Sequence, residues 1–119
     1  MKEADLKRAV WDYLQYGMNQ GKWYFDRLNS GAIYEKRGNR TYGVQLCREG
    51  TADFMVIRAR RYFNNAPQVI APEIIFLELK GDKGKQRPEQ GAFQKLIEAQ
   101  GAEYYIVRSI EELETILTK

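Results

Sequence analysis

One apolar run ends in two charges: Glu73-Ile74-Ile75-Phe76-Leu77-Glu78-Leu79-Lys80. The turn-forming stretch Gly81-Asp82-Lys83-Gly84 follows it, so the pattern predicts a buried strand that ends in an exposed loop. Because side chains alternate along a strand, Glu78 and Lys80 share one face. A buried carboxylate is costly unless a partner compensates its charge. Glu78 therefore needs a partner, either Lys80 in a simple ion pair at the end of the strand or a metal ion.

A second apolar strand with an acid at its start is predicted at Gly50-Thr51-Ala52-Asp53-Phe54-Met55-Val56-Ile57. If the two strands are neighbours in one sheet, Asp53 can lie beside Glu78 at one end of it. Two carboxylates that close together favour a cation between them. Hard oxygen ligands of this kind suit Mg²⁺ or Mn²⁺.

Size and composition indicate one globular domain over residues 1–119, with 44% hydrophobic and 13% aromatic residues. No apolar run reaches the length of roughly 20 residues that spans a bilayer, so no membrane partner is expected. The single cysteine, Cys47, agrees with a reducing compartment. We expect a cytoplasmic protein, in the host cytoplasm if the gene belongs to a phage.

The absence of histidine excludes Ser-His-Asp catalysis, Cys-His catalysis and zinc sites with histidine ligands. A net charge of +3 and a pI near 9.0 suggest a polyanionic partner without establishing one. Basic residues gather between Arg27 and Arg48 with Tyr24, Tyr34 and Tyr42 interleaved, which suits phosphate contact and base stacking. A solvated sheet edge protected by charge has the same composition.

The rest of the chain predicts helices and strands around one mixed sheet. Apolar spacing predicts a helix from Glu3 to about Asn19, whose first-turn Glu3 also suits the helix dipole. Before the strand at 73–80, we expect an antiparallel hairpin of 22–28 and 32–37, a polar loop at 38–43, a short strand at 44–47 and an exposed excursion at 58–72. After it, we expect a helix from Pro88 to Gly101 whose inward residues are Ala92, Phe93, Leu96 and Ile97. A strand at 103–108 and a last helix that begins with the capping box Ser109-x-x-Glu112 complete the chain.

These residues resemble the virus-type replication-repair nuclease (VRR-NUC) domain, a branch of the PD-(D/E)XK nuclease superfamily. The resemblance covers nearly the whole chain, and its motifs occur in order: Glu3, Arg-x-Asn-Ser-Gly at 27–31, Gly-x-x-Asp at 50–53, Glu-x-Lys at 78–80, and a basic loop with Lys85 followed by Gln90. Ala52 stands where family members carry proline. The implied fold is α/β (α+β) and restriction-endonuclease-like, with a mixed central sheet flanked by helices in the order α-β-β-β-β-α-β-α.

The resemblance implies a metal-dependent DNA endonuclease that hydrolyses phosphodiester bonds. Asp53, Glu78 and the Leu79 carbonyl would bind Mg²⁺ or Mn²⁺, and Lys80 would position or deprotonate the attacking water. Glu3 would hold a further water from the helix side, and Gln90 would orient Lys80 or the nucleophile. The expected DNA contacts are Arg27, Asn29, Arg58, Arg60, Arg61, Lys83 and Lys85.

We expect cleavage that is selective for DNA structure, at branched or four-way junction DNA as in DNA repair, by a homodimer with two active sites. Two alternatives stay open. One is a catalytically silent nucleic-acid-binding module with the same fold. The other is an accessory subunit in which the charged strand ends form ion pairs.

Overall fold

The computed structural model describes residues 1–63 and 67–118, without the side chains of 61–63 and 67–70. Its central sheet has the strand order β1-β4-β5-β6, formed by β1 (Tyr24–Arg27), β4 (Phe54–Phe63), β5 (Pro67–Leu79) and β6 (Glu103–Val107). β4 is antiparallel to β1 and β5, whereas β6 is parallel to β5. The two strands that carry the predicted acids are therefore neighbours in a mixed sheet, as predicted.

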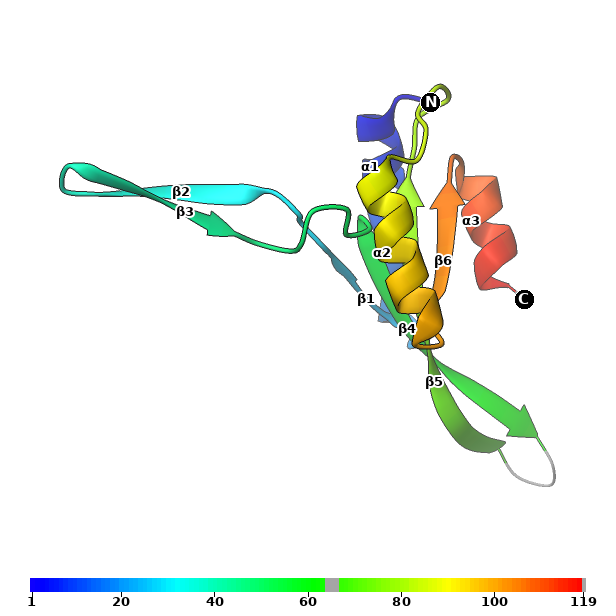
Figure 1. The fold of residues 1–119 in the computed structure, drawn as a ribbon. Coiled ribbons are helices and arrows are strands. Elements are labelled where there is room, and N and C mark those ends of the chain that lie inside the picture. The colour runs from blue at the N-terminus through cyan, green and yellow to red at the C-terminus, as the bar shows by residue number, and fades with distance from the viewer. Residues whose placement is uncertain (64–66, 119) are drawn as a thin grey trace.

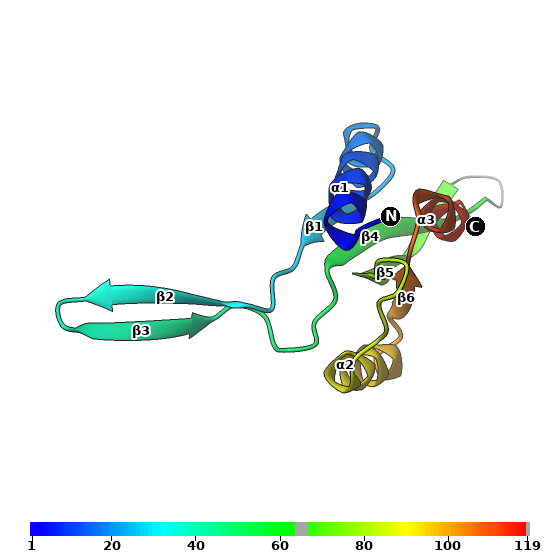
Figure 2. The ribbon, with the colours of Figure 1, turned by 90° about the horizontal axis from the view of Figure 1, so that it is seen from above.

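Helices cover both faces of this sheet (Figures 1 and 2). α1 (Glu3–Asn19) and α3 (Ile110–Leu117) lie on one face, and α2 (Pro88–Ala99) lies on the other. The fully buried core belongs to the α1 and α3 face and joins Leu6, Val10, Leu14, Phe54, Val56, Ile75, Leu77, Leu79, Val107 and Leu113. The chain is therefore a mixed α+β domain with helices flanking a mixed sheet.

Three of the predicted helices form where the sequence placed them. α1 buries Leu6, Val10 and Leu14, which are spaced four residues apart and form one stripe. α2 begins at Pro88, which tolerates the first turn because it lacks an N–H group. The predicted apolar face of α2 is partly wrong, because Leu96 is 69% exposed and the buried residue of this helix is Gln90.

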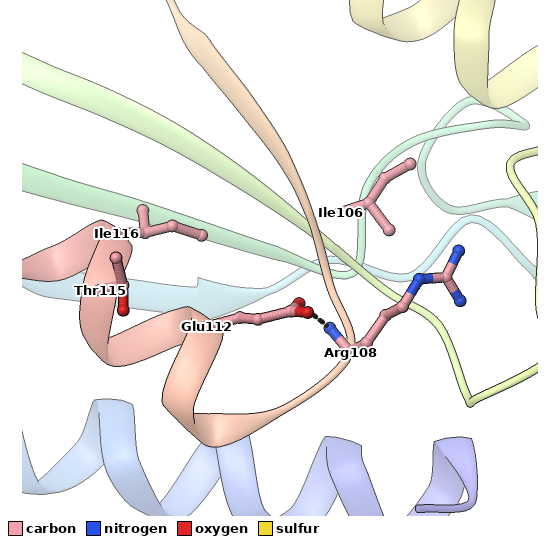
Figure 3. A pocket seen from close by; sticks show the side chains of 5 residues that line it. All are labelled: Ile106, Arg108, Glu112, Thr115 and Ile116. Atoms are coloured by element: carbon pink, nitrogen blue, oxygen red, sulfur yellow. Dashed lines mark hydrogen bonds between the residues drawn. The ribbon is translucent and has the colours of Figure 1, made fainter.

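Half of the predicted capping box at the start of α3 is confirmed. Ser109 Oγ accepts a hydrogen bond from Glu112 N, as predicted. The Glu112 carboxylate accepts from Arg108 N at 2.8 Å (Figure 3), one residue before the N-cap, whereas a capping box uses the N–H of the N-cap residue itself. These bonds satisfy two backbone N–H groups at the start of the helix. They also turn the chain directly from β6 into α3, which brings Leu113 and Leu117 onto the sheet.

The predicted pairing of residues 22–28 with 32–37 is wrong. β1 pairs with β4, while β2 (Ala32–Arg37) pairs with β3 (Arg40–Gln45). The turn between β2 and β3 is Gly38-Asn39, with Gly38 at φ +62°. Two-residue turns with positive φ match the twist of a hairpin, so this glycine fixes the pairing. Within the described residues, five strands precede α2, one more than predicted.

The predicted excursion at 58–72 is also wrong in form. β4 and β5 remain paired beyond the core of the sheet, from Arg58 opposite Glu73 to Phe63 opposite Pro67, with a bulge between Arg60 and Arg61. Residues 64–66 lie outside the described part of the chain. Pro72 lies in a two-stranded ribbon, where a strand has an unpaired edge that needs no N–H donor.

The β2–β3 hairpin, called here the arm, projects away from the sheet and helices (Figures 1 and 2). Every residue of both strands is exposed. Ile33 and Val44 are partners across the arm and are 51% and 47% exposed. An isolated two-stranded hairpin is only marginally stable in water, so a further surface must cover the arm for it to be well ordered.

Candidate active site

The pairing of β4 with β5 brings the two predicted acids to one end of the sheet. The strand register ends at Phe54 opposite Leu77. Asp53 directly precedes Phe54, and its backbone N–H donates to Leu77 O at 3.0 Å. Glu78 follows Leu77 on β5, and its side chain is close enough to that of Asp53 to form a hydrogen bond. The two carboxyl groups therefore meet at this end of the sheet.

The Asp53 carboxylate is fixed by contacts from β5 and α1. Its Oδ2 accepts a hydrogen bond from Leu79 N at 2.7 Å. Its Oδ1 lies 3.6 Å from Lys7 Nζ, and Lys7 Nζ lies 3.9 Å from Glu3 Oε2. Lys7 therefore links the carboxylate of Glu3 to that of Asp53.

Glu78 is the most perturbed group of the site. Its side chain is buried, with 3% of the residue exposed, and its Oε1 has no hydrogen-bond partner among the described residues. Burial raises the pKa of Glu78 to about 9, reinforced by a hydrogen bond with Asp53 and by the negative charge of Asp53, while the charge of Lys80 opposes the shift. A proton on Glu78 thus relieves the repulsion between two carboxyl groups that share one site.

Lys80 is buried beside them, and the loop after β5 packs on its stem. A Cβ added to Gly84 would lie 3.2 Å from Lys80 Cδ. Arg108 Nη1 donates to Gly81 O at 2.8 Å, which ties this loop to the end of β6. The lysine is 8% exposed, so its ammonium group is held at the site and does not extend into solvent.

α2 completes the site through its first turn. Gln90 is 4% exposed, and its Oε1 accepts a hydrogen bond from Arg87 N at 2.9 Å. Gly50 has φ +90°, and a Cβ at this position would lie 2.3 Å from Glu89 O. Only glycine fits such a close approach, so Gly50 lets the segment that carries Asp53 pack against the start of α2.

The site also contains groups that the sequence analysis missed. Lys7 lies four residues after Glu3 on the same helix face, a spacing that could have indicated it. Tyr104 of β6 is 7% exposed, and burial raises its pKa above the ordinary value of 10.0, as do the charges of Glu78 and Asp53. Its hydroxyl accepts a 3.4 Å hydrogen bond from Gln86 Nε2. This hydrogen bond lowers the pKa of Tyr104 and so offsets part of the shift.

The donor set of the site fits a small hard cation. Within the described residues, no three His, Cys, Asp or Glu side chains gather closely enough to form a metal cage. Mg²⁺ does not need one, because it commonly binds through one or two carboxylates and keeps several waters. Asp53, Glu78 and the Leu79 carbonyl supply oxygen only, and the unpartnered Oε1 of Glu78 is an acceptor without a donor. These residues therefore fit Mg²⁺ or Mn²⁺.

The predicted DNA-binding residues do not form one surface. Arg27 and the exposed loop residues Lys83 and Lys85 belong to the same end of the sheet as Asp53 and Lys80. Asn29 is used locally, because its Oδ1 accepts a hydrogen bond from Gly31 N at 2.8 Å.

The arginines of β4 lie toward the other end. Arg58 contacts Glu73 Oε1 at 3.0 Å and Leu117 O at 2.6 Å, and Arg60 contacts Glu73 Oε2 at 2.9 Å. Arg60 is seven residues beyond Asp53, about 23 Å along an extended strand. Arg58 therefore has a structural role, and the side chain of Arg61 lies outside the described residues.

Comparisons of the chain with protein-family models, curated proteins and solved structures give no match. Among the described helices, none has the length and apolar character needed to cross a membrane.

Proposed function

We propose that this protein is a metal-dependent DNA endonuclease with a restriction-endonuclease-like fold, a member of the VRR-NUC branch of the PD-(D/E)XK superfamily. The observation that carries the proposal is the meeting of Asp53 and Glu78 where β4 and β5 end their pairing. Asp53 N donates to Leu77 O, the Asp53 and Glu78 side chains share a hydrogen bond, and the buried Lys80 lies two residues beyond Glu78. These are the residues of the Gly-x-x-Asp and Glu-x-Lys motifs, which lie 25 residues apart in the sequence.

Asp53, Glu78 and the Leu79 carbonyl would hold Mg²⁺ or Mn²⁺. When bound, such an ion polarises a phosphate oxygen and lowers the pKa of a coordinated water. Glu78 must lose its proton to serve as a ligand, and Lys80 offsets the charge of the resulting carboxylate. The Leu79 N–H holds Asp53 Oδ2, which leaves Oδ1 on the side of Lys7.

The remaining groups would act on water and phosphate. Lys80 is positioned to orient the attacking water and to offset negative charge on the attacked phosphate. Glu3 would hold a second water from the α1 side, in the region where its carboxylate already meets Lys7. The amide of Gln90, whose oxygen is engaged by Arg87 N, has its N–H₂ group left to orient the nucleophile or Lys80.

We further propose that the enzyme is a homodimer that cuts branched DNA, including four-way junctions. The arm supports this proposal, because its apolar partners Ile33 and Val44 are exposed in one copy of the chain. A second copy of the chain that packs on the arm would bury them. Two copies then bring two sites to the two strands of one branched molecule.

The test is a cleavage assay on linear, flapped and four-way DNA with Mg²⁺, with Mn²⁺ or with a chelator. We expect cleavage of branched DNA that requires metal. Glu78→Gln and Lys80→Met should each lower its rate by about 100-fold or more, because the first removes a metal ligand and the second removes the positive charge beside the attacked phosphate. Glu103→Gln is the matched control, since Glu103 is also a glutamate with a buried carboxyl oxygen but belongs to the start of β6, where it interacts with Glu73 and Tyr105.

Three results separate the proposal from its alternatives. Full activity in Glu78→Gln would refute the assigned site. Binding of branched DNA without cleavage by the wild-type protein under all metal conditions would identify a silent binding module. Neither binding nor cleavage would favour an accessory subunit.

A further inference from the structure

A hollow between α1 and β1 adjoins the candidate active site. Its volume is about 350 Å³, and it is lined by Ala4, Lys7, Arg8, Trp11, Arg27 and Phe54. The α1 residues recur at helical spacing, so they form one stripe, which runs beside the buried stripe of Leu6, Val10 and Leu14. Arg27 is the partner of Phe54 in the pairing of β1 with β4, so both point to the α1 face. The volume falls within the range of small-ligand sites, which begins at about 300 Å³.

Two cations in this hollow have no anionic partner. Within the described residues, neither Arg8 nor Arg27 takes part in an ion pair or a side-chain hydrogen bond. Both residues are exposed. By contrast, Arg58, Arg60, Arg37 and Arg87 each contact a carboxylate. A phosphate is the ligand whose charge and geometry suit two such guanidinium groups.

Trp11 gives the hollow an aromatic wall. Its ring meets Phe25 edge to face, with 4.9 Å between centroids, and is tilted against Phe54 at 6.4 Å. These contacts fix the indole while the residue stays 40% exposed. A fixed and exposed indole is a stacking platform for a nucleic-acid base, provided that the base is not stacked within a duplex.

Lys7 connects the hollow to the candidate active site. It lines the hollow, and its Nζ lies 3.6 Å from Asp53 Oδ1. A nucleotide in the hollow would therefore be next to a phosphate at Asp53 and Glu78. Lys7 would contact the phosphate group that the two positions share.

We propose that this hollow is the subsite for an unpaired nucleotide of the DNA substrate, next to the phosphate that is cleaved. Trp11 stacks on its base, and Arg8 and Arg27 bind its phosphate. This assignment rests on the proposed nuclease function and deepens it, because it makes an unstacked nucleotide, as at a branch point, the recognised feature. No covalent step occurs in the subsite.

The first experiment measures tryptophan fluorescence with a short oligothymidylate in the presence of a chelator, so that no cleavage occurs. The chain has two tryptophans, Trp11 and Trp23, and Trp23 Nε1 is bonded to Leu14 O. Trp23→Phe leaves Trp11 as the reporter, and Trp11→Phe leaves Trp23. We expect the oligonucleotide to quench the first variant and not the second. Equal quenching of both would overturn the stacking assignment.

The second experiment measures affinity for the same oligonucleotide over a range of salt concentrations. Trp11→Ala should weaken binding by about 5- to 150-fold, the range for loss of one stacked base. Arg8→Ala and Arg27→Ala should each reduce the slope of log K against log salt by about 0.7. Lys95→Ala removes one exposed positive charge from α2, on the opposite face of the sheet, and is the matched control.

The outcomes separate this proposal from the nuclease function. Quenching of Trp11 and altered salt slopes without cleavage by the wild-type protein would keep the subsite and refute the nuclease. Metal-dependent cleavage with slopes in Arg8→Ala and Arg27→Ala equal to that of Lys95→Ala would keep the nuclease and overturn the subsite. Circular dichroism melting of each variant establishes that it is folded before these comparisons are made.

Discussion

The buried carboxyl of Glu78 should make the stability of the metal-free protein depend on pH. Its pKa is about 9 in the fold, against an ordinary value of 4.5, because of burial and the nearby Asp53. Between these two values the folded state holds a proton that the unfolded chain has lost. Stability from this group is therefore fully present below pH 4.5 and is lost as pH rises toward 9.

The size of the effect follows from linkage. Within this window the free energy of unfolding falls as pH rises, by roughly 3 kcal/mol between about pH 6 and pH 8. Glu78→Gln has nearly the same shape as the protonated carboxyl and does not titrate. The free energy of unfolding of the wild-type protein, minus that of Glu78→Gln, should therefore fall by about this amount between about pH 6 and pH 8.

The assay is urea unfolding followed by circular dichroism, in the presence of a chelator and at several pH values. Asp12→Asn, which removes an exposed carboxylate on the outer side of α1, is the control for a general effect of charge. Its difference from the wild-type protein should vary little over the same range. A constant difference between wild type and Glu78→Gln would refute the reasoning, because Glu78 would then ionise in the fold as it does in the unfolded chain.

Two further predictions concern backbone packing and assembly. Gly50 and Gly101 both have positive φ, so alanine at either position should cost about 1–3 kcal/mol of backbone strain. Only at Gly50 would the added Cβ also clash with backbone, at Glu89 O. Gly50→Ala should therefore lose more stability in urea unfolding than Gly101→Ala. Equal losses would show that this close approach to α2 is unimportant. Replacement of 32–45 by Gly-Gly should convert a dimer into a monomer of the same fold in light scattering, since Leu46 N already bonds to Gly31 O at 3.0 Å and the ends of the deleted segment are adjacent. A monomeric wild-type protein at micromolar concentration would contradict the homodimer.

Local sequence pattern was sufficient for much of the fold. The stripe of Leu6, Val10 and Leu14 is an interaction within one helix, and the Ser109 N-cap bond lies within four residues. The neighbouring strands that carry Asp53 and Glu78 could also be predicted, because each combines an apolar run with an acid at a position next to a glycine-rich turn.

Long-range pairing was less predictable because two turn signals compete in the arm region. Asn29-Ser30-Gly31 and Gly38-Asn39 both suit a turn. In the structure Asn29 Oδ1 accepts from Gly31 N, which redirects the chain out of β1, while Gly38 with its positive φ closes the hairpin. β1 is thereby free to pair with β4, a contact between residues about 30 positions apart that no local signal specifies.

Long-range pairing also decides which of the predicted DNA-binding residues remain available to DNA, and the sequence of charges alone does not show it. Arg58 and Arg60 belong to an arginine-rich stretch, yet Glu73 lies opposite Arg58 in the register and contacts both. Hydrogen bonding with Glu103 and with the two arginines lowers the pKa of Glu73 to about 2, although burial acts in the opposite direction. The carboxylate of Glu73 is therefore charged and binds both arginines. A positive charge attracts DNA most strongly where no carboxylate already neutralises it. Arg8 of α1 and Arg27 of β1 meet that condition within the described residues, and the contacts of the substrate should be sought there.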